Sequence, residues 1–235
     1  MIKLKDKIVA LYASPIGKKY VTGITGLSLV LFTLVHMSGN LAYFSSDPTA
    51  YNAYTKFLHD LGPLLYLAEI GLLAFFLFHV VLGVNIAITK RRARKNRYRK
   101  YKSLGGPSRQ SVASRSMIYT GIILLVFTVM HLITFKFGPG MAEGYVTTIN
   151  GEEARDLKRL VTETFQNPFY AFGYTGVMLL LALHLRHGIW SAFQSLGAMT
   201  PRLSPLIYAA GGFVGVLIAV GFFVLPLYVY FTGGA

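Results

Sequence analysis

Two of the six histidines, His36 and His131, are preceded by the same pattern of residues at the same offsets. The pattern is a Thr-Gly pair followed by a Phe-Thr pair: Thr25-Gly26 and Phe32-Thr33 before His36, and Thr120-Gly121 and Phe127-Thr128 before His131. A neutral imidazole is a good ligand for iron, and two imidazoles on facing segments can hold one metal ion between them. The repeated pattern therefore predicts that His36 and His131 act as a pair.

His79 and His184 form a second set, because each lies eight residues after one glycine and four residues before another. The glycines are Gly71 and Gly83 around His79, and Gly176 and Gly188 around His184. This pattern predicts an internal repeat, in which the first two apolar segments are duplicated in parallel orientation by the next two. The chain has no cysteine, which excludes disulfides, zinc–thiolate sites and cysteine-held iron–sulfur clusters. Metal chemistry must therefore rest mainly on the histidines.

The elements that must position these histidines are transmembrane helices. The chain is 54% hydrophobic and 14% charged, which is too apolar for a soluble domain of 235 residues. A hydrocarbon core of about 30 Å needs about 20 helical residues, and five stretches are long enough. They cover approximately residues 20–44, 63–89, 116–137, 168–196 and 205–231. We expect an all-α integral membrane bundle of five transmembrane helices, with residues 1–235 as one domain.

Basic residues gather on one side of this predicted bundle. Five lysines precede the first span and eleven basic residues lie between Lys90 and Arg115, whereas the opposite side carries only five. The positive-inside rule places the N-terminus in the cytoplasm and the C-terminus outside. Because these residues flank apolar spans, the net charge of +14 indicates membrane topology, and we expect no nucleic-acid partner.

Helical rise places the four histidines at two depths. His36 and His131 lie roughly 23 Å from the cytoplasmic ends of their spans, near the outer leaflet. His79 and His184 lie roughly 24 Å from the outer ends of theirs, near the inner leaflet. The two pairs are therefore expected roughly 15 to 20 Å apart within a core of about 30 Å. Two b-type haems stacked across a membrane, each held by two histidines, need this arrangement.

Other residues of the repeat suit a haem site. The glycines make room for a flat macrocycle beside the helix backbone, although glycine is also common at ordinary helix contacts in membranes. Thr33 and Thr128 lie one turn before their histidines and can accept the second ring N–H. A single intramembrane histidine is more often a hydrogen bonder between helices, but four in matching register favour paired ligands.

Some polar residues near the histidines have alternative roles. His187 competes with His184 as a ligand, but only His184 keeps the glycine offsets of His79. His187 and Arg186 are then candidates to contact haem propionates or a quinone. His59 is expected in a solvated loop. Glu69 is the only acidic residue well inside a span, so it is a candidate for proton exchange with a quinol, or a polar contact near the outer interface.

The long segment between the third and fourth spans is expected to contain an interfacial helix. Asn150 followed by Glu153 resembles a helix start. Apolar residues then recur along one face: Leu157, Leu160, Val161 and Phe165. Such a helix can cover the outer mouth of the bundle or simply stiffen the loop.

Three motifs carry a resemblance to a known family. They are Ser14-Pro-Ile-Gly-Lys-Lys19, Leu31-Phe-Thr-Leu-Val-His-Met-Ser-Gly-Asn40, and His184-Leu-Arg-His-Gly-Ile-Trp190 continuing to Gly197. With these motifs the chain resembles the cytochrome b membrane anchor of succinate dehydrogenases and fumarate reductases, in its five-helix, single-subunit, di-haem type. In that family the first and third helices ligate the distal haem and the second and fourth the proximal one. The histidine pairing deduced from depth is the same.

The resemblance implies cofactors and partners that the residues alone do not. It implies two haem b groups, a quinone that is commonly menaquinone, and docking on the inner face to a flavoprotein subunit with FAD and an iron–sulfur subunit. The succinate site of the tricarboxylic acid cycle enzyme would lie on the partner, and the chain would be a multi-pass protein of the prokaryotic inner membrane. Some fumarate reductases of this type have a glutamate two residues before the fourth-helix ligand. This chain has Ala182 there, which argues against a proton pathway through that position.

Two other functions remain open on sequence grounds. The chain could be the cytochrome b subunit of another respiratory enzyme, such as a hydrogenase or formate dehydrogenase, whose catalytic partners typically face outward. It could also be a redox-free transporter or anchor, in which the histidines join helices or relay protons. Co-purifying partners discriminate the first alternative, and an absorption spectrum discriminates the second.

Overall fold

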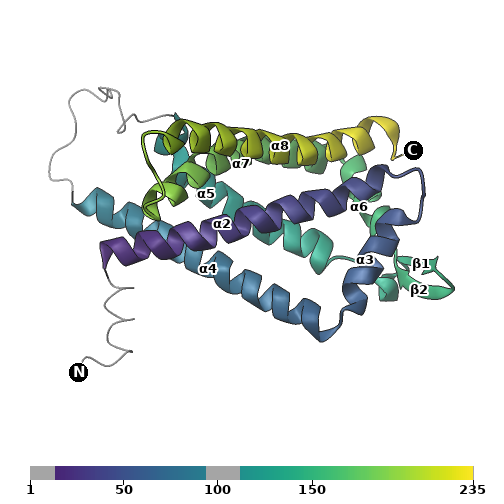
Figure 1. Cartoon of the computed structure of the whole chain (residues 1–235). Coiled ribbons are helices and arrows are strands. Elements are labelled where there is room, and N and C mark those ends of the chain that lie inside the picture. Colours follow the sequence, from purple (N-terminus) through teal and green to yellow (C-terminus); the bar gives the residue numbers. More distant parts are fainter. Residues whose placement is uncertain (1–13, 94–111, 235) are drawn as a thin grey trace.

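The computed structural model describes residues 14–93 and 112–234, and its main elements are five long helices (Figure 1). These are α2 (Pro15–Asn40), α4 (Pro63–Arg92), α5 (Val112–His131), α7 (Pro168–Ser195) and α8 (Leu203–Thr232). A 3-10 turn over Leu41–Phe44 extends α2, and a π-helical turn over Leu132–Lys136 extends α5. All five are long and apolar enough to cross a membrane, which confirms the predicted all-α membrane bundle. Most of the basic segment between α4 and α5 lies outside the described residues.

Proline and capping side chains set the starts of three of these helices. Pro15, Pro63 and Pro168 occupy the first turns of α2, α4 and α7, where a missing N–H costs nothing. The Ser14 side chain accepts a hydrogen bond from the Gly17 N–H at 2.9 Å, and Asn167 does the same for Phe169. Both bonds satisfy backbone donors that have no partner within the helix.

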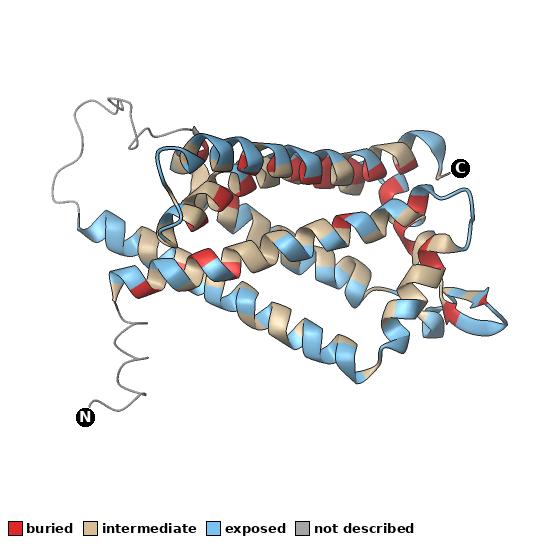
Figure 2. Ribbon diagram, viewed as in Figure 1, coloured by how far each residue is buried: buried red, intermediate tan, exposed pale blue. Residues whose placement is uncertain are grey.

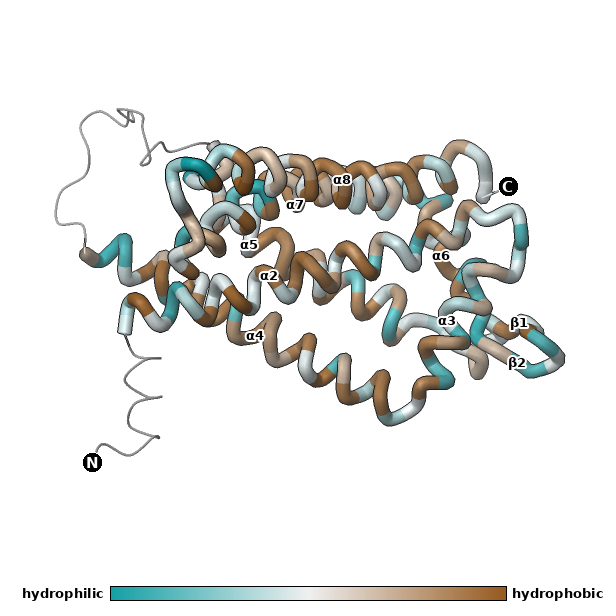
Figure 3. Tube along the Cα trace, viewed as in Figure 1, coloured by the Kyte–Doolittle hydropathy of each residue, from teal (hydrophilic) through white to brown (hydrophobic). Residues whose placement is uncertain are grey.

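Burial is concentrated where α8 packs on α7 and at the end of the bundle that the charge pattern predicts to face outside, which we call the outer end (Figure 2). Gly215 allows α8 to approach α7 closely. A Cβ added at this position would lie only 3.1 Å from the Ala182 carbonyl oxygen. In contrast, α4 is largely exposed and apolar (Figures 2 and 3), with Leu67 and Ile70 67% and 65% exposed. In a membrane protein such side chains face lipid or a neighbouring subunit.

Helices and a hairpin cover the outer end, and we call this group the outer cap: α3 (Ala50–Asp60), β1 (Val146–Ile149), β2 (Glu152–Arg155) and α6 (Leu157–Gln166). The predicted helix start at Asn150 is wrong. Asn150 and Gly151 have positive φ values of 55° and 84°, and they form the tight turn that pairs β1 with β2. The helix begins only at Leu157, where the Asp156 side chain accepts from the Arg159 N–H at 3.0 Å.

The expected apolar face of α6 is present, since Leu160, Val161 and Phe165 are all buried. Helix α3 was not expected, and it places His59 on a helix rather than in a loop, although the residue is exposed as predicted. The exposed Lys56–Asp60 ion pair, at 2.7 Å, lies on the same helix. The cap is therefore more ordered than a simple connecting loop.

Arg155 closes the outer end of α5. Its guanidinium donates to the carbonyl oxygens of Pro139 at 3.0 Å and Gly138 at 3.1 Å. Gly138 is required here, because an added Cβ would collide with the Thr134 carbonyl oxygen. The π-helical turn is thereby tied to the hairpin, and Lys136 is held at its end.

Asn52 joins α3 to α6. Its amide nitrogen donates to Asp156 Oδ1 at 2.8 Å, and its amide oxygen accepts from the Lys158 N–H at 2.9 Å. Asn52 is 5% exposed, so both bonds are shielded from water. Replacing Asn52 with leucine should lower the free energy of unfolding of the cap by about 1–3 kcal/mol, because buried polar partners lose their bonds. Thermal unfolding and protease cleavage of the hairpin measure this loss.

Thr55→Ala is the matched control for Asn52→Leu. Its hydroxyl only donates to the Asn52 carbonyl oxygen within α3, at 2.9 Å. We expect little change in the melting temperature of this variant. Equal melting temperatures for Asn52→Leu and Thr55→Ala would contradict the role given to Asn52.

Candidate functional site

The outer histidine pair joins α2 and α5. The ring centroids of His36 and His131 are 5.7 Å apart, and the rings are nearly perpendicular at 84°. Phe32 stacks on His36 at 5.5 Å, and Phe127 stacks on His131 at 5.8 Å. Each imidazole therefore has the same aromatic neighbour, one turn earlier on its own helix.

The inner histidine pair joins α4 and α7. The ring centroids of His79 and His184 are 6.4 Å apart, with 69° between the rings. It is the ring of His184 that lies against His79, whereas His187 lies beside Trp190 with a centroid separation of 5.8 Å. The geometry therefore favours His184 over His187 as the partner of His79, as the glycine offsets did.

Glycine contacts fix the vertical separation of the two pairs. A Cβ at Gly26 would lie 3.1 Å from His79 Cε1, so Gly26 of α2 is level with the inner pair. A Cβ at Gly121 of α5 would lie 3.5 Å from His184 Cε1. His36 and His131 each follow their glycine by ten residues, or about 15 Å of helix. The pairs therefore occupy two levels separated by about that distance.

The spacing of both pairs fits a shared metal. Imidazole–metal bonds are about 2 Å long and the ring centroid lies about 1 Å further back, so two imidazoles on one metal have centroids roughly 6 Å apart. The observed values of 5.7 Å and 6.4 Å lie on either side of this figure. Among the described residues, His79 Nδ1 and His131 Nδ1 are buried ring nitrogens that lack a hydrogen-bond partner. Buried polar atoms without partners are uncommon, and each pair holds one.

Thr33 and Thr128 do not make the hydrogen bonds to histidine rings that the sequence led us to expect. The hydroxyls of Thr33 and Thr128 donate to the carbonyl oxygens of Leu29 at 2.7 Å and Leu124 at 2.8 Å, rather than meeting a histidine ring. The hydroxyl that does reach an imidazole is that of Thr120, 3.1 Å from His184 Nδ1. The repeated Thr-Gly pairs were the signal in the sequence that could have pointed to it.

Arg186 is directed away from the inner pair. Its guanidinium donates to the Tyr208 hydroxyl of α8 at 2.8 Å and lies 5.1 Å from the centre of that ring. His187 is partly buried, one residue further along α7. The structure does not bring Arg186 together with His184 and His79.

Glu69 forms an ion pair with Lys136, which joins α4 to the π-helical end of α5. The two side chains are 36% and 42% exposed. Glu69 precedes His79 by ten residues, and Tyr174 precedes His184 by the same ten. Tyr174, which no sequence pattern indicated, is 7% exposed and has its ring 6.2 Å from that of His131. The Glu69 carboxyl group and the Tyr174 phenol therefore lie at about the same depth as the outer histidine pair.

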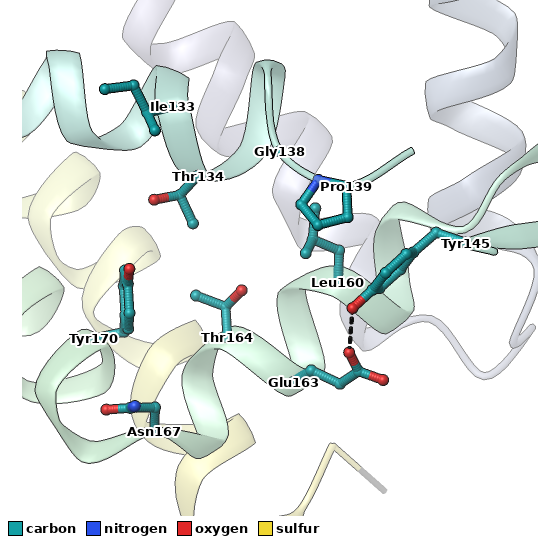
Figure 4. Close-up of a pocket in the computed structure, with 10 residues that line it drawn as sticks. All are labelled: Ile133, Thr134, Gly138, Pro139, Tyr145, Leu160, Glu163, Thr164, Asn167 and Tyr170. Carbon is teal, nitrogen blue, oxygen red and sulfur yellow. Dashed lines mark hydrogen bonds between the residues drawn. The ribbon is translucent and has the colours of Figure 1, made fainter. Parts of the chain in front are cut away.

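A pocket of about 410 Å³ with a mixed apolar and polar lining lies at the outer end, between the end of α5 and helices α6 and α7 (Figure 4). Thr134, Tyr170 and Asn167 line it, with the Tyr145 hydroxyl donating to Glu163 at 2.5 Å. This hydrogen bond, followed by that from Arg159 at 2.7 Å, lowers the pKa of Glu163 below its usual value.

The pocket is connected to the outer pair by aromatic rings. Tyr170 lines the pocket, and its ring lies 6.3 Å from that of Tyr174. Tyr174 in turn contacts His131. A ligand in this pocket would therefore be two aromatic side chains away from the outer histidine pair.

Comparison with known proteins gives one clear result. A search of curated proteins and of solved structures finds no match. A family model for the succinate dehydrogenase/fumarate reductase transmembrane subunit matches residues 89–225, which is more than half of the chain. That range contains His131 and His184 and covers most of the last three spanning helices. The chain therefore belongs to the family of transmembrane subunits of succinate dehydrogenase and fumarate reductase.

Proposed function

We propose that this subunit is a di-haem cytochrome b, which carries electrons between a cytoplasmic dehydrogenase and a membrane quinone. The observation that supports this most strongly is the meeting of imidazoles from alternate helices at two levels, His36 with His131 and His79 with His184. A bound haem would supply one-electron transfer at its iron, and the protein supplies ligands, position and electrostatics.

The residues around each pair suit this role. Glycine at positions 26 and 121 lets the helix backbone approach the inner imidazoles closely. The aromatic rings of Phe32, Phe127 and Phe222 surround the outer imidazoles. Apolar surroundings exclude water from the ligands.

The inner ends of three helices meet on the side proposed to face the cytoplasm. The Lys18 ammonium of α2 donates to Asn85 Oδ1 of α4 at 2.9 Å, and Arg91 of α4 lies 3.5 Å from the Tyr119 hydroxyl of α5. This end carries the exposed basic residues Lys90 and Arg92. We propose that it docks the iron–sulfur subunit and the FAD-containing flavoprotein, which holds the succinate site.

We propose that the quinone headgroup binds in the outer pocket. Its volume of about 410 Å³ falls within the range of small-molecule sites. The Tyr170 hydroxyl offers a hydrogen-bond donor to a quinone carbonyl, and the apolar side chains of Ile133, Pro139 and Leu160 offer contacts to the quinone ring. Menaquinone is the expected species for this type of enzyme.

Glu69 is the proposed proton carrier. Replacing it with glutamine removes its ability to exchange a proton while keeping its size. Quinol oxidation should then fall at least tenfold, in line with the loss of a positioned acid–base group. Steady-state turnover with a menaquinol analogue measures this loss.

Glu153→Gln is the control for the Glu69 substitution, because Glu153 is exposed on the hairpin. Its turnover should match that of the unsubstituted complex. Normal turnover in Glu69→Gln would show that the carboxylate only holds Lys136.

Reduction by succinate in the purified complex tests the proposal as a whole. We expect succinate to reduce a b-type absorption band, a quinone analogue to reoxidise it, and flavoprotein and iron–sulfur subunits to co-purify. An outward-facing metal enzyme as the partner would instead indicate a hydrogenase or formate dehydrogenase. A complex without a reducible b-type band would indicate a redox-free anchor or transporter.

A further inference from the structure

Thr120 of α5 is the residue whose hydroxyl contacts a histidine of the inner pair. Its Oγ1 lies 3.1 Å from His184 Nδ1 on α7. Thr120 is 3% exposed, so water does not compete for this contact. A bond that joins two helices at a buried level constrains both the rotation and the tautomer of the ring.

The direction of this hydrogen bond follows from the other neighbours of the hydroxyl. Thr120 Oγ1 also lies 3.1 Å from the Met117 carbonyl oxygen and 3.2 Å from that of Ser116. A hydroxyl has a single proton, and a carbonyl oxygen can only accept. With that proton donated to the preceding turn of α5, a lone pair of Oγ1 faces the imidazole and accepts from Nδ1–H.

We propose that Thr120 is a positioning residue for His184, which accepts the Nδ1–H bond and so leaves Nε2 free as the ligand atom. The inference rests on the proposed function, because it concerns the iron ligand. An acceptor bonded to the ring nitrogen that does not bind the metal fixes the tautomer of a ligating histidine and makes the imidazole a stronger electron donor. The ferric state of the inner haem is then favoured over the ferrous state.

The two ligands of the inner pair therefore differ. His184 has the Thr120 side-chain hydroxyl as a partner, whereas the polar group that faces His79 is the backbone carbonyl of Thr22 on α2. Thr25 occupies the position in α2 that matches Thr120, and it is 4% exposed. Its hydroxyl donates to the Val21 carbonyl oxygen at 2.8 Å. The chain thus provides a residue of the same type and burial that bonds only to its own helix.

Thr120→Val tests the proposal, since valine keeps the shape of threonine and removes the hydroxyl. At a fixed applied potential, the ferric-to-ferrous ratio of the inner haem should fall about threefold to tenfold, in line with the loss of one hydrogen bond to the ligand. The low-spin ferric signal of the inner haem in electron paramagnetic resonance should shift, and that of the outer haem should not. Thr120→Ser restores the hydroxyl and should restore both values.

Thr25→Val is the matched control, with an expected unchanged ratio and an unchanged spectrum. An unchanged inner haem in Thr120→Val, or an equal change in Thr25→Val, would overturn the role of Thr120 while leaving two haems in place. The unsubstituted complex is measured alongside the variants. Absence of haem from that sample would instead overturn the proposed function on which the inference depends.

Discussion

Replacing His184 with alanine is expected to remove the inner haem and leave the outer one. Alanine has no ligand atom, and His79 alone would supply only one of the two axial bonds to the inner iron. The purified complex should lose about half of its b-type absorbance, and the remaining haem should titrate at the potential of the outer one. His79→Ala should give the same spectrum, because its ring is the partner of His184.

The reciprocal result is expected for the outer pair, where His36→Ala or His131→Ala should leave only the inner haem. His187→Ala serves as the control, since its ring lies beside Trp190 rather than His79. It should retain both haems. Loss of a haem in His187→Ala with retention in His184→Ala would reverse the assignment of the ligand.

The second large effect is expected at Gly26. An added Cβ would lie 3.1 Å from His79 Cε1, which is tighter than most real contacts, and the branches of valine would crowd the ring further. Overpacking of this kind costs about 1–3 kcal/mol. Gly26→Val should therefore displace His79 and lower inner haem occupancy roughly ten- to hundredfold under limiting haem. Haem content per chain, measured after purification, gives the value.

Substitutions at two other glycines provide a comparison for the Gly26 variant. Gly121→Ala should be tolerated better than Gly26→Ala, because the contact with His184 Cε1 is an ordinary 3.5 Å. Gly212→Val on α8 is the control, since its added Cβ has no atom within 4 Å. A haem content for Gly26→Val that equals that of Gly212→Val would contradict the close approach of α2 to His79.

The membrane spans and the histidine pairs could be predicted from the sequence, because both follow from periodic or repeated patterns of residues. Spans long enough for a membrane follow from apolar runs, because lipid requires every backbone polar group to be satisfied within a helix. The grouping of His36 with His131 and of His79 with His184 follows from equal offsets and helical rise, and the ring contacts agree with it. Depth can be counted along a straight helix, so side chains at the same level could be identified in advance.

The sequence was less informative where contacts between distant segments decide the structure. The outer cap depends on Asn52 reaching Asp156, and no local pattern predicts that contact. Asn150-Gly151 was a recognisable hairpin turn, but the acidic residue that follows suggested a helix start instead. The bond from Thr120 to His184 crosses between two helices, so it becomes visible only once α5 and α7 are packed.

The haem content of the purified complex, measured together with a redox titration, tests the central claim most directly. The proposal places one b-type haem at each of the two imidazole pairs, about 15 Å apart along the helices, so it predicts two haems per chain with two resolvable midpoint potentials. A ratio of two haems per chain with two potentials is the predicted result. A ratio of one or zero would contradict the account, because at least one histidine pair would then hold no iron.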